Sequence, residues 1–204
     1  MTEEEARDWV RSRFDVSRET QLQRYADILR DESTRQNLIA ASTLDQLWSR
    51  HLVDSAQLVP LAEGDGVWID IGSGAGLPGI VVAILTDRPV TLVEPRTKRA
   101  EFLRTTAETL RLANVTVAAS RIEVHKPARR AAVISARAVA PLYELFGGAG
   151  HCADSSTVWL LPKGRNVESE VEATRGAWQG AFHVEPSITS PDSGIVVARG
   201  VRPK

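Results

Sequence analysis

The segment Val67–Gly79, with the sequence VWIDIGSGAGLPG, constrains the fold of this chain more than any other. A short apolar run ends at the acid Asp70, and glycines follow at alternate positions, namely Gly72, Gly74 and Gly76. Glycine adopts positive φ at little cost and lets the backbone approach a ligand closely. A second apolar run begins after Pro78, a residue tolerated in the first turn of a helix. We therefore predict a strand, a tight turn and a helix whose free N–H groups face a nucleotide or nucleoside.

Two cofactor classes fit this turn. The spacing Gly74-x-Gly76-x-x-Gly79, with Glu94 about 20 residues further on, matches the dinucleotide pattern of NAD enzymes. The longer pattern that starts at Asp70 resembles the first motif of S-adenosylmethionine-dependent methyltransferases. In those proteins the turn holds the methionine part of the cofactor, and the acid after the second strand takes the ribose hydroxyls. Asp70 favours the methyltransferase, because a carboxylate repels a pyrophosphate but is tolerated beside a sulfonium and an ammonium; a glycine turn without a ligand is the third possibility.

Strand-like and helix-like segments alternate after this turn, which predicts an α/β fold with a mostly parallel sheet. We expect strands near 67–71, 90–94, 114–119, 131–135 and 156–162, and helices near 78–86, 96–112 and 139–150. The C-terminal segments Gly180–Val184 and Gly194–Arg202 predict an antiparallel hairpin. Helical spacing at 3–14, 17–33 and 43–61 predicts a helical extension over residues 1–62, followed by one methyltransferase domain over residues 63–204.

Composition narrows the class of protein. A hydrophobic content of 43% with 25% charged residues is typical of a globular protein, and no apolar run approaches the roughly 20 residues of a membrane span. The acidic start of the chain does not resemble a signal peptide, and the single Cys152 excludes an internal disulfide. The four histidines lack metal-ligand spacing. We expect a cytoplasmic monomer without a metal or a membrane partner.

Polar side chains follow the expected strands, at the edge where parallel sheets bind ligands. Glu94 follows the second strand, Ile122 and Glu123 follow the third in the loop expected beside the adenine, and Arg137 follows the fourth, where the reacting methyl is expected. Arg137 suits a carboxylate, a phosphate or a base edge, or forms a structural salt bridge. Basic residues at the start of the helix expected at 96–112 oppose the helix dipole, so a stabilising role does not explain them, and contact with phosphates and a solvated basic face are the two readings that stay open. The candidate RNA contacts are Arg96, Lys98 and Arg99, with Lys163 and Arg165 after the fifth strand.

Several of these segments occur in order in one family. Asn37-Leu38, Arg50-His51-x-x-Asp54-Ser55, the run Asp70–Gly79, Lys98-Arg99, Arg121-Ile122-Glu123, Ser135-Ala136-Arg137-Ala138 and Lys163-Gly164 resemble the glucose-inhibited division protein B family, the bacterial 16S rRNA guanine-N7 methyltransferases. The resemblance covers residues 35 to 165 and implies a class I methyltransferase fold that binds S-adenosylmethionine. It implies cofactor contacts from Gly72, Leu77, Ile122, Glu123 and Arg137, besides the turn residues Asp70, Gly74 and Gly76 and the acid Glu94. Members usually carry Asp after the second strand, whereas this chain carries Glu94-Pro95.

The resemblance also implies a mechanism and a partner. The methyl group moves from S-adenosylmethionine to N7 of a guanine in 16S rRNA, presented as RNA or as a small ribosomal subunit. Guanine N7 has a free lone pair and loses no proton, so no catalytic base is expected, and Arg137 is the nearest candidate for a catalytic role. Two alternatives stay open: a methyltransferase acting on another substrate, and a non-catalytic ribosome- or RNA-binding module that retains the pocket.

Overall fold

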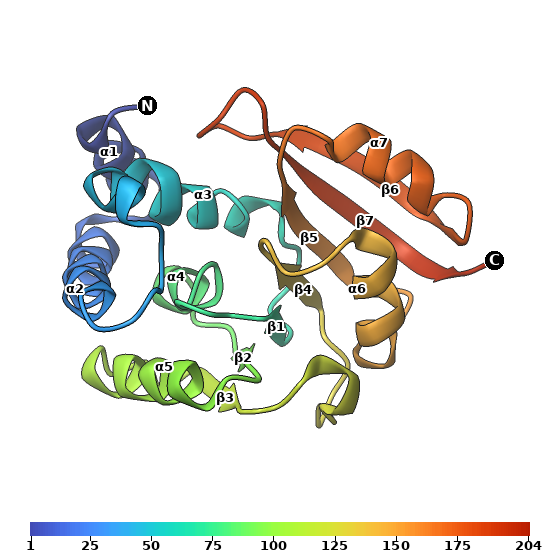
Figure 1. Ribbon diagram of the computed structural model, residues 1–204, viewed down its shortest axis with the longest axis horizontal. Coiled ribbons are helices and arrows are strands. Elements are labelled where there is room, and N and C mark those ends of the chain that lie inside the picture. Colours follow the sequence, from blue (N-terminus) through green and yellow to red (C-terminus); the bar gives the residue numbers. More distant parts are fainter.

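Seven strands form one sheet through the centre of the computed structural model, which describes residues 1–204 (Figure 1). The strands lie in the order β3-β2-β1-β4-β5-β7-β6. Their bounds are β1 Trp68–Ile71, β2 Val90–Val93, β3 Val115–Ala118, β4 Val133–Ala136, β5 Val158–Lys163, β6 Trp178–Pro186 and β7 Gly194–Pro203. The first five pair in parallel, and β7 runs antiparallel between β5 and β6. The predicted parallel sheet with a C-terminal antiparallel hairpin is confirmed.

Helices cover both faces of the sheet. One face carries α1 Glu3–Phe14, α2 Val16–Ser33, α3 Val53–Ala56, α4 Gly79–Leu85 and α5 Thr97–Thr109, and the other carries α6 Leu142–Ala149 and α7 Val167–Thr174. Successive strand residues point to opposite faces, so Trp68 packs under α4 while Ile69 packs under α6. The packing between the sheet and the helices is apolar on both faces. Because both faces of the central strands are buried, these strands are apolar almost throughout. None of the helices has the length and the apolar character needed to cross a lipid bilayer.

The segment between α2 and β1 differs from the single predicted helix at 43–61. It consists of short turns: a 3-10 turn Ala41–Gln46, a π turn Trp48–Leu52, α3 and a 3-10 turn Val59–Leu61. The carboxylate of Glu3 accepts hydrogen bonds from the backbone N–H groups of Trp48 and Ser49, each at 2.9 Å, and so fixes the start of the π turn. A long-range contact therefore decides the local conformation here. Helix α7 was also not predicted from the sequence.

The N-terminal helices share their core with the sheet. Leu22, Tyr25 and Leu29 of α2 lie in the same buried cluster as Ile80 and Ile84 of α4. The hydroxyl of Tyr25 donates a hydrogen bond of 2.6 Å to the carbonyl of Ala75, inside the glycine turn. The extension thus supports the turn directly, and the proposed division at residue 62 stays a prediction.

Removing that hydroxyl tests the connection. We expect Tyr25→Phe to lower the free energy of unfolding by about 1–3 kcal/mol, because the buried Ala75 carbonyl loses its partner. The matched control Tyr143→Phe removes an exposed hydroxyl that contacts Glu144 and is expected to change stability by less than about 0.5 kcal/mol. Urea denaturation of both variants measures the difference, and equal losses would contradict a supporting role for Tyr25.

Candidate cofactor and substrate site

The glycine turn after β1 has the geometry that its sequence predicts. Gly72, Gly74 and Gly76 have φ values of 63°, 55° and 91°, a region that favours glycine. The backbone N–H of Gly74 donates a 2.8 Å hydrogen bond to Oε2 of Glu94, and the N–H of Arg96 donates to Oε1 at 2.9 Å. Glu94 therefore ties the end of β2 to the turn after β1. A carboxylate has further lone pairs, so these two bonds leave it able to accept from a ligand.

Asp70 lies behind the turn instead of facing the cofactor. Its side chain has no solvent-exposed surface, and it accepts hydrogen bonds from Ser135 at 2.7 Å and from the N–H of Gly79 at 3.2 Å. Burial raises the pKa of Asp70 to about 6, against the lowering effect of these donors. The predicted direct cofactor contact of Asp70 is therefore replaced by a positioning role: it holds the start of α4 to the sheet.

The turn opens into a hollow of about 470 Å³. Its walls come from the turn, the N-terminal turns, α5 and the end of β4, and comprise Leu38, Thr43, Arg50, His51, Asp54, Gly72, Ser73, Gly74, Ala75, Leu77, Arg99, Arg137 and Ala138. A Cβ on Gly74 would have no protein atom closer than 3.6 Å, so this position is kept open on the hollow side. By contrast, a Cβ on Gly72 would lie 2.8 Å from Val139, and one on Gly76 would lie 2.6 Å from Ile80.

The residues around the turn fit an adenosyl cofactor. Gly74 presents bare backbone to the hollow, and Ile122 lies partly buried after β3, where an adenine ring would pack. Glu94, which would accept from ribose hydroxyls, is nearly buried beside the turn and already accepts from the N–H of Gly74. The Oγ of Ser120, in the same loop, is buried without a hydrogen-bond partner. Glu123 is exposed, pairs with Arg121 at 3.4 Å, and lies close to Gly148. The structure contains no group of three or more His, Cys, Asp or Glu side chains placed to hold a metal ion.

Arg137 belongs to a polar cluster that sequence reasoning did not assemble. Its guanidinium pairs with Asp54 at 3.2 Å and lies 3.4 Å from Nδ1 of His51. Asp54 also accepts a hydrogen bond from Thr189 at 2.9 Å, in the loop between β6 and β7. Arg50 lies four residues before Asp54 in the sequence, but Asp54 pairs with Arg137 across the site. In the sequence, the only indication of this cluster is that the segments containing His51, Asp54 and Arg137 belong to the set of segments that resembles one family.

His51 is neutral in this cluster. Burial lowers its pKa to about 4, and the nearby charge of Arg137 acts in the same direction. The Thr43 hydroxyl donates its proton to the carbonyl of Ala40 at 2.8 Å, so it accepts from Nε2–H of His51 at 2.8 Å. This assignment leaves the lone pair of Nδ1 facing the guanidinium of Arg137.

The predicted basic residues do not form one surface. Arg96 and Lys98 are exposed and make no ion pair, whereas Arg99 lines the turn hollow and donates to the carbonyl of Asn37 at 3.3 Å. Arg165 is exposed and pairs with Asp192. Lys163 is mostly buried and donates to the carbonyl of Ala140 and to Glu170, each at 2.8 Å. Because Lys163 is paired within the protein, we replace its predicted RNA contact with a positioning role.

Comparisons with known proteins match both the sequence and the fold. A family model described as "GidB: rRNA small subunit methyltransferase G" matches residues 18–193. A protein of Rhizorhabdus wittichii named "Ribosomal RNA small subunit methyltransferase G" is 50% identical, over 100% of this chain and 95% of its own length. A protein of Zymomonas mobilis with the same name is 45% identical, over 100% and 96%.

Solved structures support the fold alone. The glycopeptide N-methyltransferase MtfA in complex with S-adenosyl-L-methionine superposes with a TM-score of 0.60 at 10% identity, over 73% of this chain and 93% of that one. A predicted O-methyltransferase of Agrobacterium tumefaciens gives a TM-score of 0.58 at 21% identity, over 73% and 80%. The class I methyltransferase fold predicted from the sequence is thereby confirmed.

Gly74→Val tests the turn as the cofactor site. The new side chain enters the open hollow, and its β-branch disfavours positive φ. We expect a folded variant that no longer binds S-adenosylmethionine, measured by calorimetry beside circular dichroism. A folded variant that binds as tightly as the parent would place the cofactor elsewhere, and tight binding of NAD to the parent would revive the dinucleotide alternative.

His51 predicts a pH dependence of stability. Its folded pKa of about 4 lies below the ordinary 6.5, so the unfolded chain binds this proton more tightly, and stability falls as the pH drops from 6.5 to about 4. We expect His51→Asn to lose less stability than the parent between pH 7 and pH 4.5, measured by urea denaturation at both values. His183→Asn, at an exposed site beside Glu185, is the control and is expected to keep the parent's dependence. Parallel curves for parent and His51→Asn would contradict the assignment.

Proposed function

The chain belongs to the GidB family of small-subunit rRNA methyltransferases, and from that premise we propose that it transfers a methyl group from S-adenosylmethionine to N7 of a guanine in 16S rRNA. The observation that carries the proposal is the hollow at the glycine turn, which is lined by bare backbone at Gly74 and by the Arg137–Asp54 pair. The carboxylate of Glu94 holds that backbone from behind through the N–H of Gly74. The cofactor contacts in the proposal are Gly72, Gly74, Gly76, Leu77, Glu94, Ile122, Glu123 and Arg137.

The mechanism relies on positioning. S-adenosylmethionine supplies an electrophilic methyl group on a sulfonium, and guanine N7 offers a lone pair without losing a proton. The residues of the chain therefore need only align the two reactants and favour the positive charge that moves to the purine. Asp54 is a carboxylate in the wall of the hollow, and its pairing with Arg137 fixes it there. Neutral His51 fixes the other side of Arg137 without competing for Asp54.

Mapping N7-methylguanine tests the proposal. Chemical cleavage at N7-methylguanine in small-subunit rRNA is expected to give one site that is present in cells with this protein and absent from cells without it. An unchanged cleavage pattern, with methylation of another substrate by the purified protein, would favour the second methyltransferase hypothesis. An unchanged pattern with retained rRNA binding and no methyl transfer would favour the non-catalytic module.

Arg96 and Lys98 are proposed to contact RNA phosphates, because both are exposed, unpaired and placed at the start of α5, where the dipole disfavours cations. Reversing both to Glu is expected to weaken RNA binding and to make its salt dependence shallower, by about 0.7 in slope for each phosphate that the variant no longer binds. Calorimetry is expected to show unchanged cofactor affinity.

The matched control reverses two other exposed arginines, Arg24 and Arg104, and so changes the net charge equally. A control variant whose RNA affinity falls as far as that of Arg96→Glu/Lys98→Glu would mean that overall charge, and not these positions, matters. Arg165 is a further proposed RNA contact, and a monomeric state in the cytoplasm stays a prediction.

A further inference from the structure

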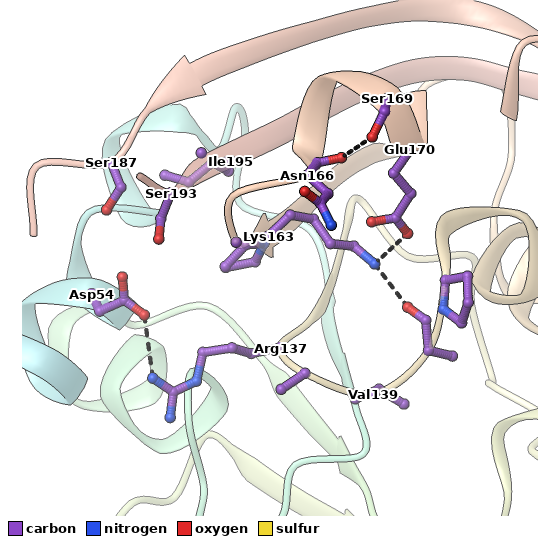
Figure 2. A pocket seen from close by; sticks show the side chains of 16 residues that line it. Asp54, Arg137, Val139, Lys163, Asn166, Ser169, Glu170, Ser187, Ser193 and Ile195 are labelled. Atoms are coloured by element: carbon purple, nitrogen blue, oxygen red, sulfur yellow. Dashed lines mark hydrogen bonds and ion pairs between the residues drawn. The ribbon is translucent and has the colours of Figure 1, made fainter. Parts of the chain in front are cut away.

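A second hollow, of about 680 Å³, opens beside the first (Figure 2). It lies between the segment after β4, the start of α7 and the loop between β6 and β7. The two hollows share only Asp54, Arg137 and Ala138. Its volume is within the range of pockets that hold small ligands. A ligand bound in the second hollow would lie beside Arg137, which also lines the hollow at the glycine turn.

A fixed wall separates the two hollows. Ala138 has φ of 55°, which is unfavourable for a residue with a side chain, and Val139 packs over Gly72. Lys163 and Glu170 hold the next residues: Lys163 donates to the carbonyl of Ala140, and Glu170 accepts from the N–H of Leu142 at 2.7 Å. Figure 2 shows the Lys163 ammonium between Glu170 and this wall. The opening between the hollows is therefore set by the protein and not by a ligand.

Charges in the second hollow are already paired. Arg137 pairs with Asp54 and Lys163 pairs with Glu170, so two cations face two carboxylates. Such a lining has no surplus charge to attract a phosphate. It suits a neutral polar group, such as a nucleobase, whose edge is read by hydrogen bonds.

Two polar side chains in this hollow have no hydrogen-bond partner in the protein. Asn166 precedes α7, where an asparagine side chain ordinarily caps the helix, yet it makes no cap bond, and its amide extends toward the cavity in Figure 2. The hydroxyl of Ser193 is likewise unpaired and lies on the opposite wall. An amide both donates and accepts, which matches the adjacent donors and acceptor on the N1, N2 and O6 edge of guanine.

We propose that the target guanine occupies this second hollow, with N7 toward Arg137 and the cofactor and with its N1–N2 edge read by Asn166 and Ser193. The inference rests on the proposed function, because it assumes that guanine N7 is the acceptor. In this arrangement the RNA phosphates contact exposed basic residues outside the hollow, such as Arg96 and Lys98. The neutral base lies in the hollow, where the charged side chains are paired with one another. Asn166 and Ser193 are thereby specificity-determining residues of the site.

Filling the hollow tests its use. Gly164 lines it and a Cβ there meets no atom within 4 Å, so Gly164→Trp attaches a large side chain at a position that is open at Cβ. Gly150 is equally open but lies outside the hollow, which makes Gly150→Trp the matched control. With small ribosomal subunits from cells that lack the protein as substrate, we expect Gly164→Trp to abolish methyl transfer and Gly150→Trp to retain it. Both are expected to bind S-adenosylmethionine as the parent does.

Removing the two unpaired groups tests the contacts. Asn166→Ala and Ser193→Ala are each expected to lower kcat/KM for the subunit by about tenfold, because each variant lacks one hydrogen bond to the base, with unchanged cofactor affinity and melting temperature. The control Ser155→Ala removes an exposed hydroxyl elsewhere and is expected to match the parent.

Parent-like transfer by Gly164→Trp, or by the Asn166→Ala/Ser193→Ala double variant, would overturn the subsite and leave the proposed function intact. A parent protein that transfers no methyl to the subunit would instead refute the proposed function itself.

Discussion

A buried carboxylate joins the three elements on which the site is built. Asp70 lies on β1, accepts from Ser135 on β4 and from the backbone of Gly79 at the start of α4, and Ser135 in turn accepts from the indole N–H of Trp68 at 2.8 Å. All seven residues of α4 are buried, so the helix has no solvent to satisfy its first N–H groups. A carboxylate at a helix N-terminus is favoured by the dipole, which offsets part of the cost of burying it. The glycine turn is the loop that spans this junction.

The turn is held from two further directions. Tyr25 reaches it from the N-terminal helices, and Glu94 reaches it from β2. The carboxylate of Glu94 binds N–H groups on both sides, those of Gly74 and Arg96. The backbone facing the cofactor is therefore fixed before any ligand binds, and less entropy is lost on binding.

The sequence carried enough information for the sheet and for the glycine turn, because these depend on local patterns, whereas the cofactor contacts stay predictions. Apolar runs of strand length, glycines at alternate positions and polar residues at strand ends each have a short-range physical cause. Contacts between distant segments could not be predicted from the sequence. The turns at residues 41–61 depend on Glu3, the pairing of Arg137 with Asp54 depends on the fold, and Lys163 proved to be paired inside the protein although its sequence context suggested an RNA contact. Asn166 could not be singled out because an asparagine before a helix ordinarily caps it, and the missing cap bond is visible only in the structure.

The loop between β6 and β7 forms one wall of the site and contacts residues that lie far earlier in the sequence. Thr189 donates to Asp54, and Gln57 donates to Ser187 and accepts from the N–H of Ile188. These contacts join residues that are 130 to 135 positions apart in the sequence. Bringing such distant segments together lowers the entropy of the chain, and the formation of local structure does not offset that loss. Synthesis runs from the N-terminus, so this loop is made after the glycine turn and after both members of the Arg137–Asp54 pair. The wall that it contributes is therefore the last part of the site that the chain can complete.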